Sequence, residues 1–400
     1  MISPLSPGAA SASAVDVRIR RVPTLLADGR ELIYFDDADT TLGAERRAAS
    51  RTLDERPGTA NMHQDPLTGE WVSIASTRQN RAHLPPARFD PLAPQTPDNP
   101  SEIPNVYDVA VFENRSPSFG PALREGAAGA DAATPASSAA EIADLRAIGI
   151  GRTKPSLGRC EVVCFSPDHD GSLGTQPTTR IRTIVEAWAD RTAALSALPG
   201  VQQIFPFENR GEAIGVTLHH PHGQIYSYPY ITPRTERVLA SATAYRERTG
   251  GELFADILES ERGSDRVLIA GEHFTAYVPF AARWPIEVHM LPHRHIPDLA
   301  ATTLAERDEL ATLLPRLLRG IDALYDSPTP YILAWHQAPL HVGRDGVRLM
   351  LQITSPRRAP DKLKFLAGSE AAMGAWIGDI SPEVGAAALR AAIEKVDASA

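Results

Sequence analysis

The segment Phe207–Tyr226, F-E-N-R-G-E-A-I-G-V-T-L-H-H-P-H-G-Q-I-Y, decides how the rest of this chain is interpreted. Its centre is H-P-H-G-Q at residues 220–224. If this part is extended, alternate side chains point to one face, so His220, His222 and Gln224 are predicted to share a surface. A single His-x-His pair is usually a surface turn, but the Glu-Asn-x-Gly lead-in and the following glutamine favour a functional site.

In this motif the chain resembles the histidine-triad superfamily and, within it, the galactose-1-phosphate uridylyltransferase family, whose nucleophile motif is H-P-H-G-Q. The resemblance extends from about Asp65 to Glu370. It implies an α+β fold in which two histidine-triad-like halves are fused, each with an antiparallel sheet and helices packed on it. It also implies a homodimer with composite sites.

The resemblance implies that His222 attacks the α-phosphorus of UDP-glucose, and that galactose 1-phosphate then takes the uridylyl group from the histidine. A neutral imidazole is a good nucleophile near pH 7, provided that an acceptor, commonly a backbone carbonyl, fixes its tautomer. Gln224 can hold a phosphoryl oxygen but cannot act as a general acid or base, which disfavours hydrolysis of the intermediate. The chemical step requires no divalent metal.

Further substrate contacts are predicted from family-like motifs and from donors near the nucleophile. Two arginines follow an N-terminal P-L-T-G-x-W motif, where guanidinium groups suit phosphate, although on their own they would be interpreted as surface charge. Other candidates lie in a V-F-x-N segment, in the segment before the nucleophile, and in a K-F-x-x-G-x-E loop. The full set is Arg78, Arg81, Phe112, Asn114, Asn209, Gly215, Thr217, Lys364, Phe365 and Glu370.

The zinc site of the family is predicted to be degenerate. The family usually carries C-P-x-C, which with two histidines completes a tetrahedral site. This chain has Asp90 and Ala93 at those cysteine positions, and His169 and His220 as the remaining ligands. Alanine cannot bind metal, so we expect zinc to be absent or weakly held.

The order strand, Pro-x-His, helix, strand, histidine occurs twice, first around His169 and again after Pro285–Leu291. We infer from this repeat that the chain consists of two duplicated halves, and that the second half is catalytically degenerate. In that half His336 is intact, but the later family histidines appear as Met350 and Gln352. We therefore predict a hydrogen-bonded structural role for His336 and no metal there.

The predicted organisation is a disordered tail (1–16), an N-terminal half (17–235) with a flexible Ala/Gly/Ser-rich insertion (120–156), and a C-terminal half (236–400). A net charge of −9 argues against nucleic acid as a partner. There is no apolar run long enough to span a membrane, and two cysteines read as free thiols, so a cytoplasmic location is expected.

Two other functions are compatible with the same sequence motifs. An adenylyl-type phosphorylase or transferase, acting on ADP-sugars or dinucleoside polyphosphates, also uses an H-x-H-x-Q motif. The missing metal ligands suggest instead a paralogue that binds nucleotide sugars without activity. Retention of His222, Gln224 and the arginines argues against the second alternative.

Overall fold

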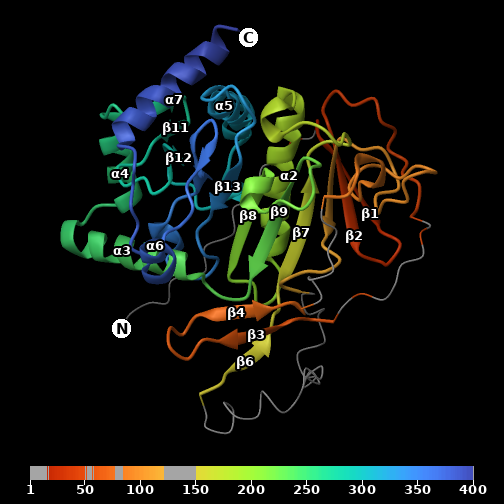
Figure 1. Ribbon diagram of the computed structural model, residues 1–400. Helices are drawn as coiled ribbons and strands as arrows, with labels where there is room; N and C mark the ends of the chain where they lie inside the picture. Colours follow the sequence, from red (N-terminus) through yellow and green to blue (C-terminus); the bar gives the residue numbers. More distant parts are fainter. Residues whose placement is uncertain are drawn as a thin grey trace, which may run out of the picture.

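The computed structural model describes residues 16, 18–49, 51, 56, 58–76, 84–120 and 150–399. Its centre is an eleven-stranded sheet in which every neighbouring pair is antiparallel (Figure 1). In spatial order the strands are β1 (Arg20–Leu25), β2 (Glu31–Asp36), β5 (Val109–Glu113), β7 (Arg159–Cys164), β9 (His222–Tyr228), β8 (Gln203–Arg210), β13 (Tyr331–His336), β14 (Met350–Ser355), β12 (Ile286–Pro292), β11 (Phe274–Tyr277) and β10 (Val267–Ala270).

The two halves of the chain meet at one strand pair in the middle of this sheet. β8 pairs with β13, so that Leu333 lies opposite Glu208. From this pair outward the order is β8, β9, β7, β5 on one side and β13, β14, β12, β11 on the other. Each half therefore repeats the same arrangement about a local two-fold axis, which confirms the predicted α+β fold and the repeat.

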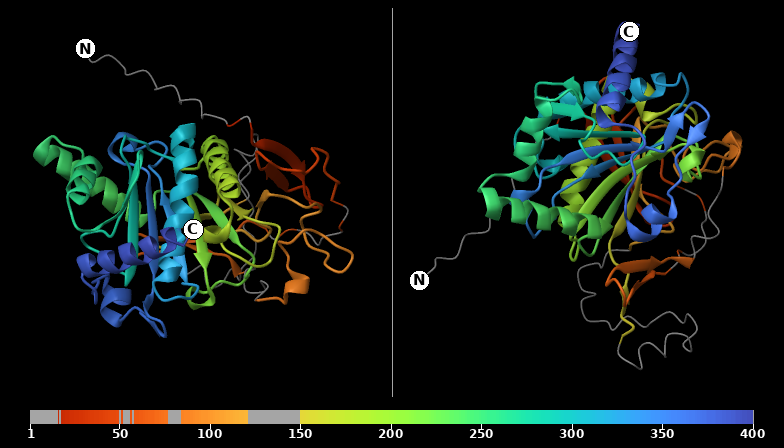
Figure 2. Two further views of the ribbon diagram at one scale, coloured as in Figure 1. Left: turned by 90° about the horizontal axis from the view of Figure 1, so that it is seen from above. Right: turned by 60° about the vertical axis from the view of Figure 1, so that its left-hand side comes forward.

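Two long helices cover one face of the sheet, one from each half: α2 (Thr178–Ser196) and α5 (Leu304–Ala323), which lie side by side (Figure 2). The apolar stripe of α2, including Ile181 and Trp188, is fully buried in the main core. A capping box opens α5: the Thr303 hydroxyl accepts from the Glu306 amide and the Glu306 carboxylate accepts from the Thr303 amide.

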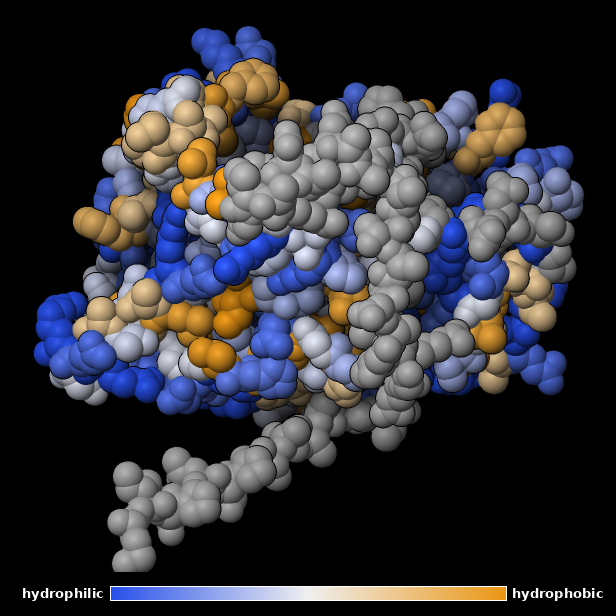
Figure 3. Space-filling model, turned by 90° about the horizontal axis from the view of Figure 1, so that it is seen from below, coloured by the Kyte–Doolittle hydropathy of each residue, from blue (hydrophilic) through white to orange (hydrophobic). Residues whose placement is uncertain are grey.

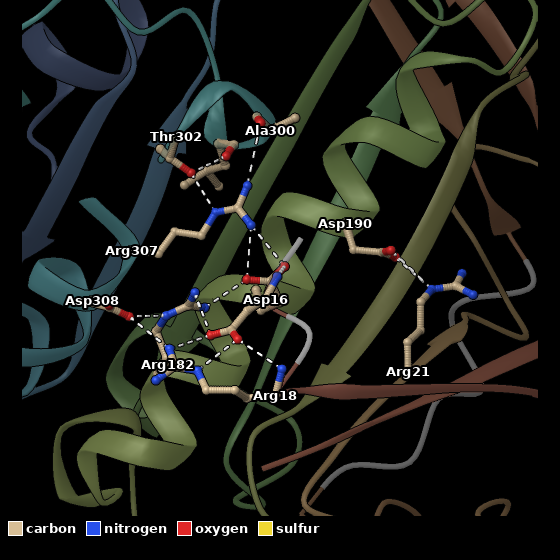
Figure 4. Close-up of polar contacts among 11 residues, drawn as sticks. Asp16, Arg18, Arg21, Arg182, Asp190, Ala300, Thr302, Arg307 and Asp308 are labelled. Carbon is tan, nitrogen blue, oxygen red and sulfur yellow. Dashed lines mark hydrogen bonds and ion pairs between the residues drawn. The ribbon is translucent and has the colours of Figure 1, made fainter. Parts of the chain in front are cut away.

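A buried polar network ties α2 to α5 (Figure 4). The Arg307 guanidinium, which is fully buried, lies 2.9 Å from both carboxylate oxygens of Glu186. Arg182 donates to the same carboxylate at 2.8 Å and pairs with Asp16 at 3.1 Å. Because buried charges need partners, this network fixes the two halves against each other through their helices.

On the opposite face, side chains of α3 and α4 pack against β11 and β12 in the second half, and Leu92, Ile103 and Tyr107 pack against β2, β5 and β7 in the first, while the face at His222 and Gln224 stays partly exposed. A small three-stranded sheet lies below the main one (Figure 1). These remaining elements are α3 (Pro233–Thr249), α4 (Leu253–Arg262), α6 (Gly368–Met373), α7 (Pro382–Asp397), β3 (Asn61–Gln64), β4 (Trp71–Ile74), β6 (Thr153–Pro155), β15 (Arg357–Ala359), β16 (Lys362–Leu363), and the 3₁₀ turns η2 (Ala87–Phe89), η3 (Leu173–Thr175), η4 (Glu212–Ile214), η5 (Leu299–Ala301) and η6 (Arg344–Gly346).

The small sheet corrects one prediction. The flexible insertion was expected to extend to residue 156, but Thr153–Pro155 forms β6, which pairs antiparallel with Asn61–His63. Its strand character depends on β3, a partner distant in the chain, and so is not visible in the local composition. Residues 121–149, the bulk of that insertion, lie outside the described part of the chain. None of the helices in the described part has the length and apolar content to cross a membrane.

Candidate active site

The predicted nucleophile, His222, is the first residue of β9 and lies on the sheet face opposite to α2 and α5. Along β9, His222 and Gln224 are partly exposed, whereas the alternating Gly223 and Ile225 are buried. Ile225 belongs to the core beneath α2. The strand therefore presents an imidazole and an amide together on the open face, as the alternation predicted.

Hydrogen bonding fixes the tautomer of His222. Its Nδ1 lies 2.7 Å from the backbone carbonyl oxygen of His220. Because a carbonyl oxygen only accepts, Nδ1 carries the hydrogen and Nε2 keeps its lone pair. Burial lowers the pKa of His222 below its usual value, so the imidazole is neutral at pH 7. The structure thus identifies the carbonyl that orients the nucleophile.

The side chain of His220 does not share the surface of His222, and that prediction is wrong. The strand begins only at His222, so its alternation does not reach residue 220. His220 is 1% exposed, with Nδ1 at 2.7 Å from Asp90 Oδ2 and Nε2 at 2.8 Å from the Ser166 carbonyl oxygen. This residue is therefore an internal support for the backbone that holds the nucleophile.

Asp90 joins the two former metal-binding histidines. Its Oδ2 lies 2.7 Å from Nδ1 of His220 and 2.7 Å from Nδ1 of His169. The two ring nitrogens of His220 thus face the Asp90 carboxylate on one side and the Ser166 carbonyl oxygen on the other. Burial acts to raise the pKa of Asp90, but the hydrogen bond and charge of His220, with the His169 hydrogen bond, lower it to about 2.

These residues do not fit a closed zinc site of the family type. Ala93 offers no ligand, and the Nδ1 atoms of His169 and His220 are directed at Asp90 rather than at a shared open position. Asp90, His169 and His220 nevertheless remain the group of potential ligands found in the described residues, with donor atoms within 4.8 Å of one another. The Asp90 carboxylate bridges the two histidine side chains.

Strand register places Gln224 in a row of side chains that crosses ten strands on the open face. We call this set the central row. Within the described residues the Gln224 amide makes no side-chain hydrogen bond, which leaves it available to a ligand. The central row consists of Leu32, Phe112, Val162, Gln224, Phe207, Ala334, Gln352, His289, Tyr277 and Val267.

The two residues expected to line the nucleotide pocket lie at the end of β5. Phe112 belongs to the central row, is 4% exposed, and packs with Val162 and Tyr107. Asn114 accepts a hydrogen bond from the Ser116 amide through Oδ1, which leaves its Nδ2 hydrogens free of partners among the described residues. Phe112 thus offers an apolar wall, and Asn114 a donor at its edge.

The segment between β8 and β9 brings the remaining predicted contacts of the first half near His222. Asn209 lies near the end of β8 on the open face, partly exposed, with no side-chain hydrogen bond inside the described region. Gly215 has a positive φ of 82° and is exposed. The carbonyl of Thr217 accepts from the Leu84 amide at 2.8 Å. The segment therefore curves back over the sheet before reaching His220.

The predicted substrate contacts far from His222 in the sequence differ in their position and exposure. Arg78 and Arg81 lie outside the described residues. Lys364 and Glu370 are buried and pair with each other at 2.8 Å, and the Lys364 ammonium also donates to the Arg283 and Ile377 carbonyls. This lysine therefore supports its own loop within the subunit. Phe365, in contrast, is 79% exposed.

Gly223 has a packing role that sequence reasoning missed. A glycine beside a nucleophile suggests a close approach of an anion to the backbone, but the missing side chain of Gly223 faces the core. A Cβ at this position would lie 2.8 Å from the Phe165 ring and 3.0 Å from the Phe207 carbonyl oxygen. The glycine therefore lets β9 pass close to Phe165, which keeps His222 at the strand entrance.

In the second half His336 is a structural histidine, as predicted. Its Nε2 donates to Oε1 of Gln352 at 2.9 Å, and Gln352 donates to Glu287 at 2.7 Å. Burial first, and then the charge of Arg234, lowers the pKa of His336 to about 3. The ring is therefore neutral at physiological pH.

Tyr107 and Ser166 also support the site and were not found from the sequence. The Tyr107 hydroxyl donates to the Leu92 carbonyl and lies 3.1 Å from His220 Nε2, while the Ser166 carbonyl accepts from the same nitrogen. No local motif marks Tyr107. Ser166 directly precedes the Pro-x-His motif, which is the one signal that could have suggested it.

Comparisons with known proteins agree over most of the chain. The family model described as galactose-1-phosphate uridyl transferase, N-terminal domain, matches residues 50–232, and the corresponding C-terminal domain matches residues 239–394. A galactose-1-phosphate uridylyltransferase of Streptomyces lividans is 41% identical over 84% of this chain and 88% of its own length. One of Thermotoga maritima is 34% identical over 82% and 97%.

Solved structures give the same result. One described as a uridylyltransferase covers 84% of this chain and 99% of its own, with a TM-score of 0.71 and 29% identity. An ADP-glucose phosphorylase from Arabidopsis thaliana shares the fold, with a TM-score of 0.59 and 23% identity. From the family matches, the fold and the intact nucleophile motif together, the chain belongs to the galactose-1-phosphate uridylyltransferase family.

Proposed function

We propose that this protein transfers UMP from UDP-glucose to galactose 1-phosphate through a uridylyl-histidine. In the first step Nε2 of His222 attacks the α-phosphorus of UDP-glucose. The bond from that phosphorus to the bridging oxygen breaks, and glucose 1-phosphate leaves with the electron pair. In the second step a phosphate oxygen of galactose 1-phosphate attacks the same phosphorus, and the P–N electron pair returns to Nε2 as UDP-galactose leaves.

The single observation that carries this proposal is the hydrogen bond from His222 Nδ1 to the His220 carbonyl. It directs the Nε2 lone pair to the open face and stabilises the positive charge that develops on the ring during attack. Gln224, two residues further on the same face, is placed to hold a phosphoryl oxygen. Because an amide does not activate water, the covalent intermediate persists until the sugar phosphate arrives.

Intact mass spectrometry tests the proposal directly. Enzyme incubated with UDP-glucose and without acceptor is expected to gain the mass of one uridylyl group, on His222, in a linkage that is acid-labile and base-stable. A parallel incubation with ADP-glucose tests the adenylyl alternative. No adduct from either compound would contradict covalent catalysis, and an adduct from ADP-glucose alone would contradict the uridine preference.

We further propose that the Asp90–His220–His169 cluster supports the nucleophile without zinc. Asp90 fixes the ring of His220, and the carbonyl of that residue fixes His222. Dialysis against EDTA is expected to leave turnover unchanged, and elemental analysis is expected to find zinc well below one atom per chain. Stoichiometric zinc that EDTA removes together with activity would contradict this.

The substitution Asp90→Ala tests whether this cluster positions His222. It removes the acceptor of two histidine N–H groups, so kcat is expected to fall about tenfold or more with KM nearly unchanged. Asp98→Ala, an exposed carboxylate in the same segment, is the matched control. If Asp90→Ala raised KM and left kcat intact, Asp90 would have no positioning role.

We also propose a homodimer and a cytoplasmic location. Hydrophobic residues are exposed in patches between hydrophilic ones on the face seen from below (Figure 3). Phe365 at 79% and Met373 at 80% exposure are unusually open for apolar side chains in a lone subunit. Light scattering should therefore give twice the chain mass. Cys160 and Cys164 are buried and are not joined in a disulfide, which fits a reducing compartment.

A further inference from the structure

The central row reveals matching positions in the two halves. Counting outward from the pair Phe207–Ala334, the glutamine Gln224 corresponds to Gln352. Two strands further out on each side, Phe112 corresponds to Tyr277, so both halves place an aromatic ring there. The second half thus keeps the amide and the aromatic wall of the first half.

The two halves differ in the residue at the position of the proposed nucleophile. His222 precedes Gln224 by two residues, and Met350 precedes Gln352 by two residues on the equivalent strand. A thioether cannot form the stable phosphoramidate that an imidazole forms. The second half therefore retains a possible binding surface on which no group transfer through a histidine can occur.

A cavity of about 830 Å³ lies over this part of the central row. Such a volume is within the range of small-molecule sites and is large enough for a nucleotide. Tyr277, His289, Leu291 and Met350 of the sheet form its floor, and helices α3 and α4 form its walls. The cavity thus occupies, in the second half, the same face that carries His222 and Gln224 in the first.

The cavity is cationic in a chain whose net charge is −9. Four arginines line it against two carboxylates: Arg234, Arg237, Arg266 and Arg283 against Asp256 and Glu261. Both carboxylates are already engaged, since Glu261 pairs with Arg266 at 2.9 Å and Asp256 accepts from the Tyr245 hydroxyl at 2.8 Å. The Tyr245 hydroxyl is neutral and leaves the charge of Asp256 in place, so four positive charges face two negative ones and the lining keeps a net positive charge of two.

Arg234 shares two cavities with Met350, the residue at the altered nucleophile position. It lines the main cavity and also a smaller one together with Met350 and His336. Within the described residues its guanidinium has no hydrogen bond or ion pair, and that of Arg283 contacts only the Trp376 ring, at 5.5 Å. The nearby Glu287 is occupied by other donors, including His289 and Gln352. Two cations thus face the cavity beside the position where the first half would hold phosphorus.

From this geometry we propose that the cavity of the second half is a non-catalytic nucleotide site. Arg234 and Arg283 bind the phosphate as guanidinium donors, and the exposed aromatic lining residues Phe280 and Trp376 pack against the base and ribose. Arginines beside an extended apolar lining favour a nucleotide over a small inorganic anion, which would use only the charged part of the cavity. No bond is made or broken, because Met350 replaces the nucleophile.

Equilibrium dialysis with radiolabelled UMP tests this site on the full chain. Wild-type protein is expected to bind one more UMP per chain than Arg234→Met, in which affinity at this site falls about tenfold or more. Arg246→Met is the matched control, because Arg246 lies on the same helix, α3, and pairs with the exposed Asp345 outside the cavity. It should bind as the wild type does. Uridine, which lacks the phosphate, should not fill the second site.

Failure of this site and failure of the proposed catalytic function are distinguishable. UMP that remains bound to Arg234→Met, and uridylylation of His222 from UDP-glucose, report the catalytic half alone. Should Arg234→Met fold poorly, Arg283→Met provides the test, because Arg283 is exposed at the cavity rim. Equal UMP stoichiometry in the wild type and in the folded variant would overturn the proposal.

Discussion

His222→Asn is expected to lower kcat by on the order of 10⁴-fold and to abolish the uridylyl adduct, because no other group takes over from a missing nucleophile. Asparagine is the informative replacement. Its Nδ2 can still donate to the His220 carbonyl, so the local backbone should be kept while the Nε2 lone pair is lost. Steady-state release of glucose 1-phosphate from UDP-glucose in the presence of galactose 1-phosphate measures the effect.

The neighbouring histidine supplies the control for this experiment. His219 is half-exposed and pairs with Glu212 at 3.2 Å on the surface. His219→Asn should therefore keep turnover close to that of the wild type. If His222→Asn retained more than about a tenth of wild-type kcat, a loss this small would be typical of an assisting group and not of a covalent nucleophile.

The largest stability effect is expected from Glu186→Ala. This substitution removes the carboxylate that faces the fully buried Arg307 at 2.9 Å and also accepts from Arg182. Breaking a buried ion pair by deleting one member costs about 3–5 kcal/mol, since a charge is left inside the protein. Urea unfolding followed by circular dichroism should show a correspondingly lower midpoint.

An exposed ion pair that also involves α5 gives the comparison. Arg316 of α5 pairs with Asp397 of α7, with side chains 39% and 36% exposed. Asp397→Ala should cost less than about 1 kcal/mol, as surface ion pairs do. Equal losses in both variants would mean that the network between α2 and α5 does not hold the halves together.

The local pattern of the chain predicted much of the fold. The apolar stripe of α2, the capping box of α5 and the Asp-Gly turn between β1 and β2 each depend on interactions within a few residues, so the local sequence is sufficient to encode them. The duplication could also be predicted, because the two copies keep the same order of elements. The strand β6 could not, because its three residues depend on pairing with β3.

The candidate site likewise has features that the local sequence predicted and features that it did not. Alternation along β9 correctly placed His222 and Gln224 on one face, since a strand has a period of two residues. It failed for His220, where the strand had not yet begun. The role of Gly223 was also misjudged, because the close approach of Phe165 comes from β7 and its following residues, not from β9 itself.

The sequence by itself determined the imidazole proposed as the nucleophile, the amide two residues after it and the presence of Asp90 and Ala93 where the family usually carries cysteines, because these are properties of single side chains and their spacing. Only the tertiary structure decided which carbonyl holds His222, how Asp90 bridges two histidines, and where an unneutralised Arg234 meets a cavity. Those features depend on distances between residues far apart in the chain, which exist only after β8 and β13 have joined the two halves into one sheet.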